Sequence, residues 1–271
     1  MHRKTSVVVW FCVFAYAITW VAVSPLVARG LGLYEGAFPA WWHALGAVGP
    51  VAAAFLAARI GGGARLQRWL AGVTRWRISG GWWAVAVGSP IALLTAAVLV
   101  AWTVTGDWPG GTLSSGAGTD PALWAGLLVV SLAYGLGEEP GWRGFLLPTL
   151  MERHTPRVAT FFVAAIWAAW HAPFFAYRFD FDGPGTVVGF FIAMLAGAYW
   201  LSFLYIRTGG SVPAVAAWHV MWDVVNLVGA EMSSLVVAML NALMMVLGFA
   251  VVFLRGPWTA GRSEIRPPAT G

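Results

Sequence analysis

The chain has 271 residues, of which 59% are hydrophobic and only 10% are charged. A soluble globular domain is about 45–50% apolar and about 25% charged, so the composition excludes that class and predicts an integral membrane protein surrounded by a lipid bilayer. The net charge of +5 is spread over loops and not gathered on one face, which excludes a nucleic-acid partner as its explanation.

Apolar runs recur along the whole sequence, each near the roughly 20 residues that a helix needs to cross a membrane. They predict an all-α, polytopic membrane bundle of about eight transmembrane helices, forming one membrane domain over residues 1–271. The expected spans are 7–28, 41–60, 81–104, 122–150 (broken), 158–177, 186–206, 211–229 and 234–254.

The first run follows Met1-His2-Arg3-Lys4 and has two interpretations, a signal peptide or a retained helix. It is longer than a signal h-region and has no clean small-x-small cleavage site, which favours the retained helix. The single cysteine, Cys12, lies in this run. It excludes an intramolecular disulfide and a zinc site made of several cysteines.

Basic residues separate strongly when the loops are assigned alternately to the two sides of the membrane. Arg29 and Arg178 fall on one side, and the other 14 of the 16 basic residues fall on the opposite side. Because cytoplasmic loops are rich in Lys and Arg, both termini are expected in the cytoplasm.

The segments between the spans are short and polar. We expect a Gly-Arg loop at 59–80, a flexible outer loop at 105–121, an acidic-aromatic loop at 178–185 and a Pro/Arg-rich tail after Arg255. No internal repeat suggests a transporter built from duplicated halves.

Ionisable residues within the spans are few, and each is a functional candidate because charge is costly in hydrocarbon. They are Glu138, Glu139, Arg143, His171, His219 and Asp223. Glu139 and Arg143 are four residues apart on one helix face, which predicts a structural ion pair. Glu138 is turned about 100° from Glu139, so it is left as a carboxylate without that partner.

His219 and Asp223 are also four residues apart, so the carboxylate can orient the imidazole or both can face one substrate. If Arg153, Arg157 and Arg207 mark the cytoplasmic edge, Glu138, His171 and His219 lie about 22, 21 and 18 Å from it. Three helices would then present ionisable groups at similar depth. This requires the fourth span to continue through Pro140 as a kinked helix.

These residue types allow two kinds of hydrolytic site and one structural alternative. A glutamate in apolar surroundings suits a general base that activates water, with the imidazoles assisting the water and an oxyanion. Glu138, His171 and His219 are equally a zinc-ligand set, although an H-E-x-x-H motif is absent. The cofactor, none or a divalent metal such as zinc, stays open. Intramembrane histidines also serve as interhelical hydrogen-bond donors, and that alternative stays open too.

The order of "EEPGWRGFLLP" (138–148), "WAAWH" (167–171) and "HVMWD" (219–223) resembles the CPBP (ABI) family of intramembrane proteases. This family includes the type II CAAX prenyl endopeptidases and bacterial proteins linked to bacteriocin processing or self-immunity. The resemblance covers a core at about 120–230.

The resemblance implies that Glu138 is the general base, that His171 assists it, and that His219 and residue 223 hold the oxyanion. It also implies that Glu139 and Arg143 form a structural pair. Trp167 replaces the usual Phe of the family, which we expect to preserve packing. Asp223 stands where the family commonly has Asn, so either it is protonated or it orients His219, and Asn226 is a candidate for the missing amide.

Three functions follow as hypotheses. The first is an intramembrane endopeptidase, glutamic or metallo in type, acting on a membrane-associated peptide or protein. The resemblance and the use of 15 Arg against one Lys favour a bacterial plasma membrane, with export-peptide or bacteriocin processing or self-immunity as the setting. The second is an inactive membrane scaffold or immunity factor, and the third is a proton-coupled transporter.

Overall fold

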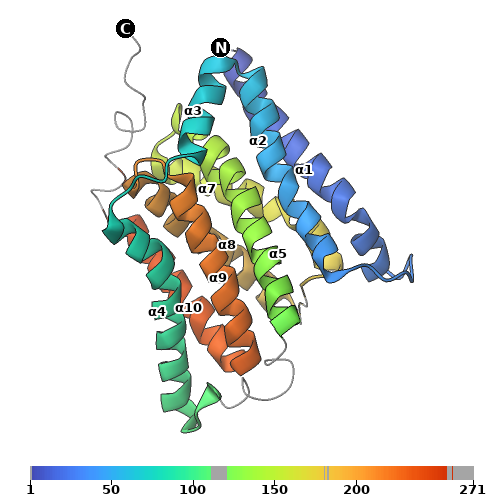
Figure 1. Cartoon of the computed structure of the whole chain (residues 1–271), viewed down its shortest axis with the longest axis vertical. Coiled ribbons are helices and arrows are strands. Elements are labelled where there is room, and N and C mark those ends of the chain that lie inside the picture. The colour runs from blue at the N-terminus through green and yellow to red at the C-terminus, as the bar shows by residue number, and fades with distance from the viewer. Residues whose placement is uncertain (1, 111–120, 180, 182, 255–257, 259–271) are drawn as a thin grey trace.

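A computed structural model describes residues 2–110, 121–179, 181, 183–254 and 258. These residues form a bundle of helices and contain no strand, which confirms the all-α prediction (Figure 1). The elements in chain order are α1 (His2–Gly30), η1 (Ala40–Ala47), α2 (Val48–Ile60), α3 (Gly63–Val73), α4 (Gly80–Thr105), α5 (Pro121–Gly141), η4 (Trp142–Leu146), α6 (Leu147–Met151), α7 (Pro156–Trp170), η5 (Ala172–Ala176), α8 (Pro184–Arg207), α9 (Val212–Met232) and α10 (Ser234–Phe253).

Seven helical segments among the described residues are long and apolar enough to cross a membrane, and each overlaps a predicted span. They are Val7–Gly30, Trp41–Ile60, Gly80–Thr105, Pro156–Ala176, Pro184–Arg207, Val212–Met232 and Ser234–Phe253. The remaining prediction, 122–150, is helical throughout as α5, η4 and α6 but is not among the seven. The protein is therefore a polytopic membrane bundle.

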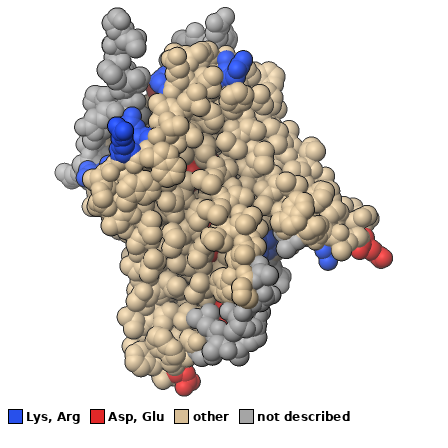
Figure 2. Space-filling view, viewed as in Figure 1, with Lys and Arg blue, Asp and Glu red and all other residues tan. Residues whose placement is uncertain are grey.

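Charged side chains lie mainly towards the ends of the molecule. Figure 2 shows that the broad surface between those ends is almost free of Lys, Arg, Asp and Glu on the face in view. Such a band is what a bilayer requires, because unpaired charge is costly in hydrocarbon.

The predicted loop at 59–80 is wrong in its middle part, because Gly63–Val73 forms α3. Leu66, Trp69 and Val73 recur at helical spacing and pack towards the core. The Gly- and Arg-rich composition hid this amphipathic pattern from the loop assignment. Of the loop expected at 105–121, residues 111–120 lie outside the described residues.

The fourth predicted span does continue through its proline. Pro140 has no N–H to donate to the carbonyl four residues earlier, yet α5 runs on to Gly141 and the chain then forms a π-helical turn, η4. The indole Nε1 of Trp69 on α3 donates to the carbonyl oxygen of Pro140 at 2.9 Å. A side chain from the neighbouring α3 therefore donates a hydrogen bond to the backbone carbonyl of Pro140 itself.

Helix α5 occupies the middle of the bundle, with α2 and η1 on one side and α9 on the other (Figure 1). Its approach to both neighbours uses glycines. A Cβ at Gly135 would lie 2.9 Å from the carbonyl oxygen of Ala216 on α9, and a Cβ at Gly137 would collide with the carbonyl group of Ala47 on η1. These close approaches fix the position of the two glutamates that follow.

We expect Gly137→Ala to destabilise the protein by about 1–3 kcal/mol, because the added methyl group overpacks the contact between α5 and η1. Gly126→Ala is the matched control on the same helix, since nothing lies within 4 Å of a Cβ there. Thermal unfolding in detergent should show a lower melting temperature for the first variant and an unchanged or higher one for the second. Equal melting temperatures would remove the close-packing argument.

Candidate active site

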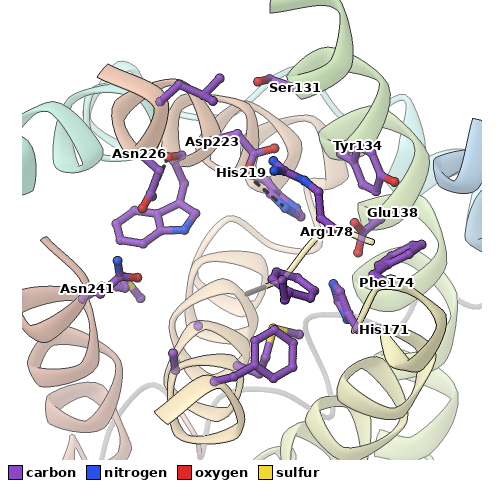
Figure 3. Close-up of a pocket in the computed structure, with 18 of the residues that line it drawn as sticks. Ser131, Tyr134, Glu138, His171, Phe174, Arg178, His219, Asp223, Asn226 and Asn241 are labelled. Carbon is purple, nitrogen blue, oxygen red and sulfur yellow. Dashed lines mark hydrogen bonds and ion pairs between the residues drawn. The ribbon is translucent and has the colours of Figure 1, made fainter. Parts of the chain in front are cut away.

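A cavity of about 550 Å³ lies between α5, α7, α8, α9, α10 and the segment after α7. Figure 3 shows Glu138 on α5, His219 and Asp223 on α9, and His171 at the end of α7, all around this space. The structure thus brings together the four residues that the sequence analysis proposed as catalytic, and three of them were expected at one depth.

Glu138 is 2% exposed, and two tryptophans hold one of its oxygens. Oε2 accepts a hydrogen bond from Trp142 Nε1 at 2.9 Å and a short one from Trp167 Nε1. Trp142 follows Glu138 by four residues on the same helical segment, whereas Trp167 comes from α7. Oε1 accepts no hydrogen bond from the described residues, so this oxygen is left for a molecule in the cavity.

Glu139 is fully buried and joins two cationic side chains at one oxygen. Its Oε1 accepts from Arg143 Nη1 at 2.9 Å and from His219 Nδ1 at 2.7 Å. The guanidinium of Arg143, also fully buried, lies 4.4 Å from the ring centroid of Trp167, a cation–π distance. The expected pair of Glu139 and Arg143 is therefore present, and it extends to α7 and α9.

The partners of the two imidazoles define which nitrogen of each is available. His171 Nδ1 lies 2.8 Å from the carbonyl oxygen of Trp167, which can only accept, so Nδ1 carries the proton. His219 Nδ1 likewise donates to Glu139. Both rings are thereby oriented through Nδ1, and both leave Nε2 for the cavity.

Asp223 Oδ1 lies 4.0 Å from His219 Nε2, an ion-pair distance but not a hydrogen bond. The group that orients the His219 ring is therefore Glu139. The amide of Asn226, one turn further on, donates to the carbonyl oxygen of Trp222 on its own helix at 2.9 Å. The choice between a donor role and an electrostatic role for Asp223 stays a prediction.

The residues present do not fit a metal site in this arrangement. Among the described residues, no group of three or more His, Cys, Asp or Glu side chains is placed to hold a metal ion. We therefore derive no step through a metal.

Several cavity residues were missed by the sequence analysis. The donor role of Trp142 was detectable, because Trp142 follows Glu138 by four residues on one helix. The donor role of Trp167 was not, because Trp167 reaches Glu138 from another helix. His43 on η1 stacks on Tyr134 at 4.9 Å between ring centroids. Arg178 also lines the cavity, and its side chain makes no hydrogen bond or ion pair within the described residues.

Residues 120–225 match the family model described as type II CAAX prenyl endopeptidase Rce1-like. The match covers less than half of the chain, and it supports the CPBP/CAAX protease family for this core. The matched segment contains Glu138, Glu139, Arg143, His171, His219 and Asp223. At the level of the family, the match supports an intramembrane CAAX-type protease. No curated protein matches the chain.

We expect Glu139→Gln or Arg143→Met alone to destabilise the protein by about 3–5 kcal/mol, because each leaves a buried charge without its partner. The double variant removes both charges and should recover part of that loss. Arg68→Gln serves as the control, because this guanidinium is 46% exposed and lies 3.7 Å from Glu152, in the class of weak surface pairs. The measurement is thermal unfolding in detergent, and additive losses in the double variant would contradict the pairing.

Proposed function

We propose that the chain is an endopeptidase that hydrolyses a peptide bond of a membrane-associated peptide or protein, with Glu138 as the general base. One observation carries the proposal. A buried carboxylate, fixed at one oxygen by two indole N–H groups, shares a cavity with two imidazoles oriented through Nδ1. General-base catalysis needs such a fixed acceptor beside the water that it activates.

The reaction proceeds by addition and elimination. Glu138 Oε1 takes a proton from water while the water oxygen attacks the carbonyl carbon of the substrate. His171 Nε2 accepts a hydrogen bond from the same water and keeps it in line. The C–N bond then breaks, and the proton passes from Glu138 to the departing amine. The products are a carboxylic acid and an amine.

His219 stabilises the oxyanion of the tetrahedral intermediate. Since its Nδ1–H is used by Glu139, it donates from Nε2 only when both ring nitrogens carry protons. The carboxylates of Glu139 and Asp223 lie on either side and attract the resulting imidazolium. We assign Asp223 to this electrostatic role, because an ionised carboxylate in contact with the oxyanion would repel it.

The setting that we propose is a bacterial plasma membrane, with both termini in the cytoplasm. The separation of 14 of the 16 basic residues onto one side supports this orientation. The resemblance to the CPBP family suggests processing of an exported peptide or bacteriocin, or self-immunity, as the physiological role.

The first test compares new peptide N-termini in membranes and secreted fractions of cells that carry wild-type protein or Glu138→Gln at equal abundance. Gln keeps the acceptor oxygen for the indoles but cannot take a proton from water. Cleavage should fall by about 10²–10⁴-fold, the usual contribution of a general base. His171→Ala should lose the same set of termini.

If the sets of new N-termini are identical for wild type and Glu138→Gln, the proposed proteolysis is wrong and an inactive membrane scaffold is favoured. A pH-dependent flux in proteoliposomes that Glu138→Gln abolishes would instead favour the transporter.

A second prediction concerns Trp167. Trp167→Phe keeps an aromatic ring beside Arg143 but removes the N–H that holds Glu138, so kcat should fall about tenfold or more, as expected for a lost hydrogen bond to a charged group. Trp170→Phe is the matched control, because Trp170 is fully buried and its Nε1 has no hydrogen bond within the described residues. If both variants cleave at the wild-type rate, the indole of Trp167 does not position Glu138.

A further inference from the structure

Two asparagines line the same cavity as Glu138 and lie in membrane-spanning helices, Asn226 on α9 and Asn241 on α10 (Figure 3). Asn241 lies outside the matched family segment, as does Asn226 by one residue. An amide side chain within a spanning helix commonly forms a hydrogen bond to another helix. That structural role is the first explanation to examine.

The hydrogen bonds of both asparagines argue against it. Asn226 Nδ2 donates to the carbonyl oxygen of Trp222, and Asn241 Nδ2 donates to that of Val237, each at 2.9 Å and each four residues back on its own helix. Neither makes a hydrogen bond to another helix within the described residues. Since a primary amide has two N–H donors and a carbonyl acceptor, each side chain keeps one N–H and its Oδ1 for the cavity.

The two amides lie at similar depth. Helix α9 ends at Met232 and α10 begins at Ser234, so the helices form an antiparallel hairpin. Asn226 precedes that turn by six residues and Asn241 follows it by seven, which places them about 9 and 10 Å along the helix axes from the turn. They therefore form one polar level in the cavity.

This level is separated from the catalytic groups by a defined distance. His219, Asp223 and Asn226 follow one another at helical spacing on one face of α9, and Asn226 lies about 10 Å from His219 along the axis. An extended chain advances about 3.3 Å per residue. The amides thus lie about three residues of extended chain away from the oxyanion position.

The chemistry of this level matches an extended peptide backbone. A chain that is unwound for cleavage brings N–H and C=O groups into apolar surroundings, and each group is costly there unless it finds a partner. Much of the cavity wall is apolar, with Met194, Val237 and Met244 among its residues. An amide with one free donor and one free acceptor complements one backbone position of such a chain.

We propose that Asn226 and Asn241 bind the backbone of the extended substrate about three residues to one side of the bond that is cleaved. The proposal rests on the proposed function, because it assumes that a peptide bond is cleaved beside Glu138. Because the backbone is recognised, this contact does not depend on the side chains of the substrate. A lipid or detergent molecule that occupies the same level is an alternative outcome of the test.

The experiment measures binding of a capped nonapeptide of alternating Leu and Ala to the Glu138→Ala protein in lipid nanodiscs. Asn226→Leu and Asn241→Leu, introduced singly, should each weaken binding about three- to tenfold, the range for one or two hydrogen bonds. An N-methylated version of the same peptide cannot donate from its backbone. It should bind weakly to the parent protein and lose less affinity with either variant than the unmodified peptide does, because only its backbone C=O groups can still bind the amides.

Thr95→Val is the matched control, because the Thr95 hydroxyl donates to its own helix at Ile91 and does not line the cavity. It should bind the peptide like the parent protein. The leucine variants should melt no lower than the parent, since they replace a polar side chain in a spanning helix by an apolar one of similar size. A lower melting temperature would show a structural role for the asparagines and overturn the proposal.

Three binding results would also overturn it: no binding of the peptide to the parent protein, unchanged binding to both leucine variants, or an equal loss for the N-methylated peptide. The outcome is independent of cleavage, because the protein carries Glu138→Ala. If peptide binding depends on the asparagines but no new N-termini depend on Glu138, the peptide site stands and the proposed proteolysis is wrong. If new N-termini depend on Glu138 but peptide binding does not depend on the asparagines, proteolysis stands and the proposed peptide site is wrong.

Discussion

A carboxylate, a guanidinium and an imidazole meet inside the membrane-spanning part of this protein, where none of the three is tolerated alone. Hydrogen bonds join Glu139 to Arg143 and His219 across α5, η4 and α9, and Trp167 covers the guanidinium from α7. Because the loss of Glu139 or Arg143 leaves a buried charge without its partner, α5, η4 and α9 are held in one arrangement. The contact therefore fixes the scaffold and also the direction of the His219 ring.

The π-helical turn that follows Pro140 and Gly141 lies directly beside this cluster. π-helical turns are rare and are often found at functional sites. Here the turn lies between the two glutamates and α6, and it carries both Trp142, a donor to Glu138, and Arg143, a donor to Glu139. The adjacent carboxylates thus have different environments. Glu139 binds Arg143 and His219, whereas the indoles of Trp142 and Trp167 hold Glu138 at the cavity wall.

The cavity itself combines a polar end at Glu138 and the two histidines with walls that are mostly apolar. Such a site suits a substrate that arrives within the membrane and must be unwound before it reacts, since both its side chains and its backbone need partners there. The amides of Asn226 and Asn241 line the same cavity, and we propose that they offer donors and acceptors to such a backbone.

Features that depend on the spacing of residues along one helix could be predicted without the structure. The apolar runs located the seven helices that meet the length and hydropathy of a span among the described residues, and the spacing of Glu139 and Arg143 located their ion pair. Helix rise predicted one depth for Glu138, His171 and His219, and all three line the same cavity. Each of these follows from the geometry of one helix and from the cost of charge in hydrocarbon.

Contacts between side chains of different helices could not be predicted from the sequence and are seen only in the tertiary structure. His219 binds Glu139, 80 residues away, and Trp167 donates to Glu138 across 29 residues. No periodicity in a sequence records such contacts, because they depend on the relative rotation and closeness of α5, α7 and α9, which glycines and bulky side chains set together. The assignment of α3 to a loop has a different cause, because its helical spacing is present in the sequence but lies among glycines and arginines.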